Sequence, residues 1–172
     1  MRKPSKYASL KSLNLNPDFV VDVGAWEETL SLKTLYPNAI HHLYEINEQH
    51  LPKLSENYAH IKHEIFTHGN APEIPTDAQV LLKVDTDSCD LQILTETDLK
   101  GVSVAVVEVM HSNVPEMFSI FRDAGFELYD IVDVGRMYGW LHQFDAVFVQ
   151  SRKRPEPDLK GWSEPYSLDI TE

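Results

Sequence analysis

Three acidic residues in this sequence lie at or near the ends of short apolar runs. Asp22 lies in Phe19–Val23, Glu45 follows Leu43 and Tyr44, and Asp85 follows Val80–Val84. Gly24 comes two residues after Asp22, where a strand would give way to a helix, and glycine lets the backbone approach a ligand closely. In an open parallel sheet, ligands bind outside the carboxyl ends of the strands. The pattern therefore predicts a ligand-binding crevice at these strand ends.

The elements that position these residues alternate between apolar strands and helical segments. Strands are predicted at residues 19–25, 39–45, 61–66, 79–85 and 102–109. Helices are predicted at residues 26–35, 47–58, 89–94 and 114–124. Two last strands, 126–134 and 146–150, are separated by about ten residues, too few for a crossover helix, so we expect an antiparallel pair. This order predicts a doubly wound α/β sheet.

The length of 172 residues and the ordinary apolar fraction of 42% indicate one globular domain. We divide the chain into a polar N-terminal lead-in over residues 1–18, a folded domain over residues 19–150, and a charged C-terminal tail over residues 151–172.

Charge, apolar runs and cysteine content indicate which partners and which compartment the protein is suited to. The net charge is −12, which repels phosphate backbones and argues against nucleic-acid binding. No stretch approaches the roughly 20 consecutive apolar residues of a membrane span, so no membrane partner is expected. The single cysteine, Cys89, excludes an internal disulfide and suits a reducing cytoplasm.

Four segments in order, with Gly125-Phe126-Glu127-Leu128, resemble the FkbM-type family of S-adenosylmethionine-dependent methyltransferases. The segments are Val21-Asp22-Val23-Gly24-Ala25, Leu43-Tyr44-Glu45, Leu82-Lys83-Val84-Asp85-Thr86-Asp87 and Asp145-Ala146-Val147-Phe148-Val149. The resemblance implies a class I methyltransferase fold, a seven-stranded and mostly parallel sheet with its last strand antiparallel. It also implies that the cofactor S-adenosylmethionine lies across the carboxyl ends of the first four strands.

The resemblance assigns cofactor contacts by position. Asp22 and Gly24 would face the methionine part of S-adenosylmethionine, and Gly69 and Asn70 would lie beside the adenine. Glu45 would accept hydrogen bonds from both ribose hydroxyls, because a carboxylate only accepts and can take two donors.

The resemblance also implies a reaction, methyl transfer to a hydroxyl oxygen of a small molecule or sugar. Asp85 would contact the cofactor near the methyl-transfer centre, and Asp85 or His111 would remove the proton of the acceptor. A histidine near its usual pKa of about 6.5 suits that role. We expect no resident metal, and the sequence leaves a homodimer open.

Other interpretations stay open beside this one. Trp26 stands where the family has asparagine and Glu28 where it has a second glycine, which is consistent with a catalytically inactive binding or assembly module. Asp85-Thr86-Asp87 also matches the Asp-x-Asp of metal-dependent nucleotide-sugar enzymes, since carboxylates suit hard cations. A magnesium ion held by Asp85 and Glu108 is a further alternative.

Overall fold

A computed structural model of the chain describes residues 5–26, 30–67, 71–87 and 89–151. It contains a seven-stranded sheet with the order β3-β2-β1-β4-β5-β7-β6. The strands are β1 (Phe19–Val23), β2 (Ile40–Tyr44), β3 (His63–Phe66), β4 (Val80–Val84), β5 (Val102–Met110), β6 (Phe126–Met137) and β7 (Trp140–Gln150). The helices are α1 (Lys6–Ser12), α2 (Leu30–Leu35), α3 (Leu51–Tyr58), α4 (Asp90–Glu96) and α5 (Val114–Asp123), with short 3-10 helices at Leu99–Gly101 and His111–Asn113.

The sheet is parallel except at β7, which runs antiparallel to both of its neighbours, β5 and β6. Strands β4 and β5 are buried along nearly their whole length, as expected of parallel strands covered on both faces. The strand order reverses between β1 and β4, so a crevice is expected at the carboxyl ends of these two strands. The predicted doubly wound, mostly parallel α/β sheet with its last strand antiparallel is confirmed.

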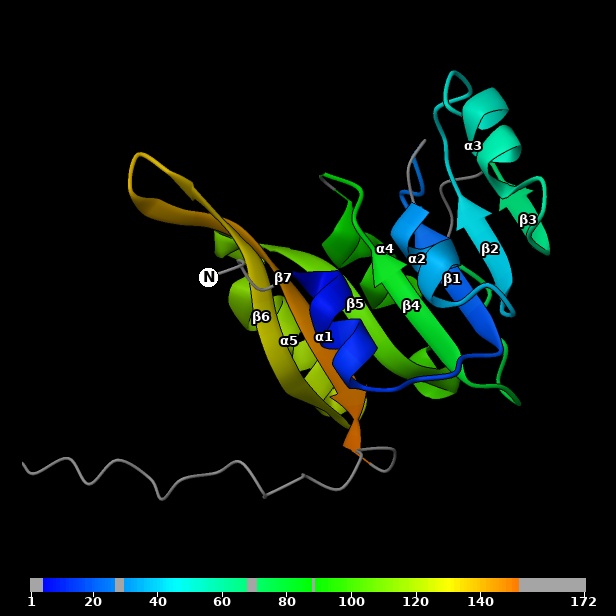
Figure 1. Cartoon of the computed structure of the whole chain (residues 1–172). Coiled ribbons are helices and arrows are strands. Elements are labelled where there is room, and N and C mark those ends of the chain that lie inside the picture. The colour runs from blue at the N-terminus through cyan, green and yellow to red at the C-terminus, as the bar shows by residue number, and fades with distance from the viewer. Residues whose placement is uncertain (1–4, 27–29, 68–70, 88, 152–172) are drawn as a thin grey trace, which may run out of the picture.

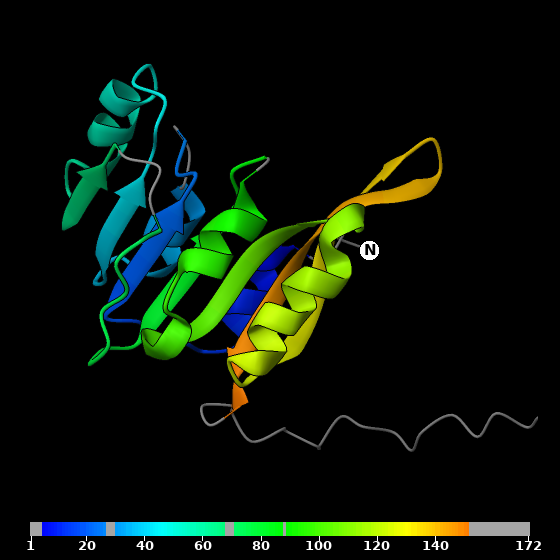
Figure 2. The ribbon, with the colours of Figure 1, turned by 180° about the vertical axis from the view of Figure 1, so that it is seen from behind.

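Helices cover both faces of the sheet, as Figures 1 and 2 show from opposite sides. On one face, Leu10 of α1 and Leu32 of α2 join a core cluster with residues of β1, β4, β5 and β7. On the other face, Met117 and Phe121 of α5 pack in a second cluster, where Phe121 stacks on Phe148 with ring centroids 4.2 Å apart. No helix in the described part of the chain is long and apolar enough to cross a membrane.

The expected polar lead-in contains a docked helix, α1. Ser5 caps its N-terminus by accepting a backbone N–H with its hydroxyl, and Leu10 and Leu13 are buried. Only seven residues form α1, so its few apolar positions give little periodic signal. The helix is held by its contacts with the sheet, because an isolated helix of this length is unstable in water.

Two predicted helices begin later than expected. The helix predicted over 26–35 is described from Leu30, and Trp26 has a left-handed backbone with φ of +47°, which no α-helical residue adopts. The helix predicted from residue 47 begins at Leu51, because a turn comes first in which the Asn47 side chain accepts the N–H of Gln49.

The β6–β7 hairpin is longer than predicted. The expected connection of about ten residues is replaced by the two-residue turn Tyr138-Gly139. Both turn residues have positive φ (51° and 85°), as a type I′ turn requires. Gly135, predicted to lie in the connection, lies inside β6 at an irregularity of the pairing.

We expect Leu10→Ala to lower the free energy of unfolding by about 2–5 kcal/mol, because it opens a cavity in the core beneath α1. Urea denaturation measures the change, with Lys11→Ala on the exposed side of the same helix as the matched control. If both variants are as stable as the wild type, α1 does not belong to the cooperative unit.

Candidate functional site

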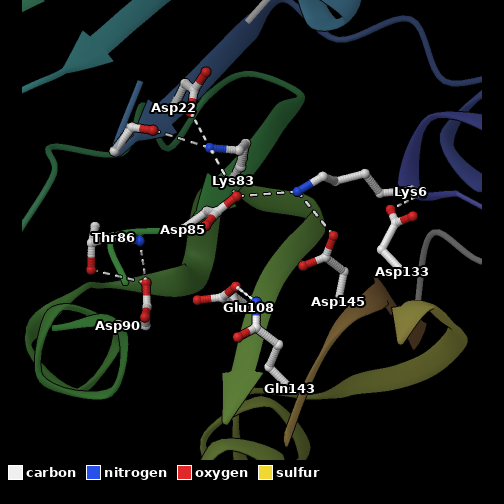
Figure 3. A network of polar contacts seen from close by, with 11 residues as sticks. Lys6, Asp22, Lys83, Asp85, Thr86, Asp90, Glu108, Asp133, Gln143 and Asp145 are labelled. Atoms are coloured by element: carbon white, nitrogen blue, oxygen red, sulfur yellow. Dashed lines mark hydrogen bonds and ion pairs between the residues drawn. The ribbon is translucent and has the colours of Figure 1, made fainter. Parts of the chain in front are cut away.

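A charge network at the carboxyl ends of β1 and β4 is centred on Lys83 (Figure 3). Its ammonium nitrogen donates to Asp22 Oδ1 at 3.0 Å and to the carbonyl oxygen of Gly24 at 3.2 Å, and lies 3.6 Å from Asp85 Oδ2. Asp22 and Lys83 are register partners on neighbouring strands, so their side chains share one face of the sheet. Asp22 is 0% exposed, and such a buried carboxylate needs a counter-charge.

Burial opposes ionisation of both members of this pair. Burial raises the pKa of the Asp22 carboxyl, and Lys83 offsets that rise only in part. Burial also disfavours the charge of Lys83, but the carboxylates of Asp22 and Asp85 outweigh it and raise the pKa of the ammonium group. Asp22 Oδ2 has no hydrogen-bond donor among the described residues. One acceptor of Asp22 is therefore left unsatisfied at the end of β1.

Gly24 allows the turn after β1 to lie directly against the chain after β4. Its φ is +77°, and a Cβ at this position would lie 2.0 Å from the backbone oxygen of Asp85. The N–H groups of Gly24 and Ala25 both donate to the carbonyl oxygen of Tyr44, at 3.0 and 3.1 Å. The sequence predicts that the backbone at Gly24 approaches a ligand closely. In this structure it approaches the backbone at Asp85.

Lys6 is a member of the site that the sequence analysis missed. Its ammonium nitrogen lies 3.1 Å from Asp85 Oδ2 and 2.9 Å from Asp145 Oδ2, and so bridges the end of β4 and the middle of β7. Its backbone N–H donates to Asp133 Oδ2 at 3.0 Å, which fixes the start of α1. No local motif marks a lysine that contacts a carboxylate 79 positions away.

Two ammonium groups thus act on Asp85. Burial alone would raise its pKa, but Lys83 and Lys6 outweigh burial and hold the pKa of Asp85 below its usual value. Asp85 is therefore ionised at neutral pH and is a weak proton acceptor there.

Glu45, the residue after β2, binds the chain after β1 with its carboxylate. Oε2 accepts the backbone N–H of Trp26 at 2.8 Å, and Oε1 accepts that of Asn47 at 2.7 Å. The indole N–H of Trp26 donates to His50 Nε2 at 3.2 Å. A carboxylate has about four acceptor positions, so Glu45 can accept further donors while these contacts persist.

Three carboxylates gather at the ends of β4 and β5. Asp85, Asp87 and Glu108 each offer an oxygen within 4.8 Å of the others, and Glu108 Oε1 accepts the side-chain N–H of Gln143 at 2.6 Å. Burial, and then the charge of Asp85, raise the pKa of Glu108 to about 7. Oxygen ligands in this arrangement could hold a divalent cation. That the site has no resident metal stays a prediction.

Of the remaining predicted site residues, the structure describes only His111. His111 follows β5 and is exposed, with Nδ1 3.3 Å from the carbonyl oxygen of His142. Gly69 and Asn70, predicted beside the adenine, lie outside the described residues, as does Glu28.

No protein-family model and no curated protein sequence matches the chain. Solved structures do match. The precorrin-6y C5,15-methyltransferase of Geobacter metallireducens GS-15 is 16% identical, with a TM-score of 0.56 over 87% of this chain and 93% of its own. The fibrillarin pre-rRNA processing protein of Methanococcus jannaschii is 14% identical, with a TM-score of 0.60 over 85% and 74%. The magnesium protoporphyrin IX methyltransferase of Synechocystis PCC 6803, solved with bound S-adenosylmethionine, is 12% identical, with a TM-score of 0.56 over 83% and 74%.

These similarities establish the fold. It is the class I methyltransferase fold. Proteins that share it act on different substrates, since the three names include a precorrin, a pre-rRNA and a porphyrin. The net charge of −12 predicts no nucleic-acid partner, but the fold does not support that exclusion.

We expect Lys83→Met to lower the free energy of unfolding by about 3–5 kcal/mol, because Asp22 would stay buried without its counter-charge. Urea denaturation at neutral pH measures the loss. Lys62→Met, at an exposed position before β3, is the matched control and should change stability by less than about 0.5 kcal/mol. Equal effects of the two substitutions would show that the buried pair of Asp22 and Lys83 does not contribute to the free energy of unfolding.

We also expect the stability to depend on the protonation of Glu108. Its pKa rises from an ordinary 4.5 to about 7 on folding, so the protonated carboxyl favours folding at low pH. The protonated Glu108 carboxyl makes its full contribution to the free energy of unfolding below about pH 4.5, and this contribution is lost as the pH rises through about 7. Glu108→Gln should therefore raise the Tm, relative to wild type, more at about pH 8 than at about pH 5.

Differential scanning fluorimetry at the two pH values measures this difference. Glu116→Gln, at an exposed position of α5, is the control and should give the same small shift at both. A shift for Glu108→Gln that does not depend on pH would contradict the prediction.

Proposed function

We propose that this protein is an S-adenosylmethionine-dependent methyltransferase of the FkbM type that methylates a hydroxyl oxygen of a small molecule or sugar. The observation that supports the proposal is the set of acids at the carboxyl ends of three adjacent parallel strands. Asp22 lies in β1, Glu45 follows β2 and Asp85 follows β4. They stand where an open α/β sheet binds its ligands, in a fold whose solved neighbours include one with S-adenosylmethionine bound.

The residues of the crevice fit the chemical groups of this cofactor. Glu45 accepts the N–H groups of Trp26 and Asn47 and lies 3.5 Å from His50 Nδ1, and its carboxylate has capacity left for a ribose hydroxyl. We assign the α-ammonium group of the methionine part to Asp22 Oδ2, which has no donor among the described residues but is buried and must be reached through the chain that covers it. Asp85, Asp87 and Glu108 place carboxylate oxygens together at the ends of β4 and β5, and such oxygens favour a nearby sulfonium cation.

When bound, S-adenosylmethionine supplies a methyl group on a positively charged sulfur for in-line displacement by an acceptor oxygen. The protein must hold that oxygen about 3 Å from the methyl carbon, exclude water and accept a proton. Asp85 stays ionised and presents a carboxylate at the centre, although Lys6 and Lys83 compensate part of its charge. Glu108, with a pKa of about 7, is a suitable proton acceptor near neutral pH. His111, beyond the end of β5, is the other candidate base.

A catalytically inactive module of the same fold is the second candidate, and the loop after β1 favours it. The N–H of Trp26 already uses one acceptor position of Glu45. Trp26 also adopts a φ of +47°, where asparagine, the residue of the family at this position, is more readily accommodated. A metal-dependent nucleotide-sugar enzyme is the third candidate, and manganese-dependent binding of a nucleotide diphosphate sugar would distinguish it.

We expect the wild type to bind S-adenosylmethionine in isothermal titration calorimetry, and Glu45→Gln to weaken binding by about tenfold or more. A hydrogen bond to a charged acceptor contributes about 1.5–3 kcal/mol, which corresponds to that factor. Glu48→Gln, at an exposed position three residues further on, should leave the affinity unchanged.

A wild type that gives no binding heat at millimolar cofactor would contradict the proposal and favour the inactive module. The Tm of Glu45→Gln must be close to that of wild type for the comparison to be valid, because Glu45 also binds two backbone N–H groups.

A further inference from the structure

The β6–β7 hairpin carries most of the exposed large apolar side chains of the described residues. They are Leu128, Tyr129, Ile131, Val134, Met137, Tyr138, Trp140 and Leu141. In the rest of the described chain only Trp26 and Ile46 are of this kind. Single exposed apolar residues are common on protein surfaces, whereas a contiguous group indicates an interaction site.

The outer part of this hairpin projects beyond the rest of the sheet, as Figures 1 and 2 show. Strand β5 pairs with β7 only as far as Met110 with Gln143, and beyond that point β6 and β7 pair with each other alone. We call residues 134–142 the arm. At its tip Tyr138 is 96% exposed and Trp140 is 81% exposed. No element of the described chain covers these two aromatic side chains.

The free edge of β6 is unsuited to the addition of another strand. Its pairing with β7 is irregular after Leu128, after Val132 and after Gly135, and Asp133 has a φ of +49°. Irregularities of this kind protect an edge strand from pairing with a further strand. A partner of the arm is therefore expected to contact its side chains.

We propose that the arm is the surface through which two copies of this chain associate about a twofold axis. A twofold contact uses the same patch on both copies, so the patch must be complementary to itself. The arm offers protruding aromatic groups at its tip. It also offers a hollow of about 310 Å³ beside them, lined by His111, Met137, Tyr138, Trp140, Leu141 and His142. The aromatic tip of one copy can enter the hollow of the other.

Area favours a second copy as the partner, and the charge of the arm itself does not oppose it. The arm contains Arg136 and no acidic residue, although the whole chain has a net charge of −12. Two copies therefore meet at the arm with less repulsion than an acidic surface would cause. Tyr138 and Trp140 can bury about 150–250 Å² each. With Val134, Met137 and Leu141 the arm approaches the roughly 800 Å² that each partner buries in a standard interface.

A lipid surface is the other partner that an aromatic tip suits, since tyrosine and tryptophan are enriched at membrane interfaces. The net charge of −12 opposes contact with anionic lipids. The hollow beside the aromatic tip suits a second copy, whose tip can enter it, better than a lipid surface, and lipid binding becomes an outcome of the test.

Sedimentation equilibrium of the full chain, from about 1 to about 100 µM, tests the proposal over the range of micromolar affinity. We expect the wild type to reach twice the mass of the monomer. The double substitution Tyr138→Ser and Trp140→Ser should raise the dissociation constant at least about tenfold, a change of about 1.4 kcal/mol. Met137→Asp, which places two like charges at the contact, should do the same independently. Ile46→Ser, at a position 70% exposed at the other end of the sheet, should leave the dimer intact.

A wild type that is monomeric throughout this range overturns the proposal, as does a dimer that persists in both arm variants. It is equally overturned if the wild type stays monomeric and sediments with phosphatidylcholine vesicles only when the arm is intact. Because the substituted side chains are exposed, the Tm of each variant should match that of wild type at a protein concentration where the wild type is monomeric, since dimerisation itself raises the Tm. This comparison separates loss of contact from loss of fold. The test needs neither cofactor nor acceptor, so its outcome is independent of the proposed activity.

Discussion

One buried ammonium group holds together the carboxyl ends of two central strands. Lys83 of β4 binds Asp22 of β1 and the carbonyl oxygen of Gly24, and it faces Asp85. β1 and β4 are the strands between which the sheet reverses its order, so this contact fixes the separation of the two strand ends where a ligand crevice is expected. An apolar pair of similar volume would hold the strands as well, but it would leave no charge beside the turn at Gly24.

Around this centre the charges form two layers. Lys83 is internal and compensates Asp22, whereas Lys6 lies further out and joins Asp85 to Asp145. With both lysines bound, Glu108 is the acid whose proton is easily gained or lost near neutral pH. The two lysines thus keep the pKa of Asp85 low, so that Asp85 stays ionised, whereas Glu108 can exchange a proton. Neighbouring carboxyl groups can serve different purposes when their surroundings set their pKa values apart in this way.

The sequence predicts the sheet and the strand-end acids because both depend on local pattern and parallel topology. A buried parallel strand is an apolar run, and an acid at its end must lie at the same edge as its neighbours. Lys6 could not be found this way, because its place in the site depends on how α1 docks against the sheet. The sequence also predicts a shorter β6–β7 hairpin than the structure has, because glycine alone does not distinguish a turn from an irregular strand. Gly135 and Gly139 both suggest a loop, yet only Gly139 lies in the turn, while Gly135 lies within β6 where the pairing shifts.

The position of Lys6 has a consequence for how the protein forms. Its backbone N–H binds Asp133, 127 positions later, and its side chain binds Asp145 in the last strand. Domains fold as units during synthesis, and contacts between distant segments must wait until both segments exist. During synthesis Lys6 therefore gains these partners only when β6 and β7 have been made. A chain that stops before β7 would have the strands that carry Asp22, Glu45 and Asp85, but it could not close the charge network around them.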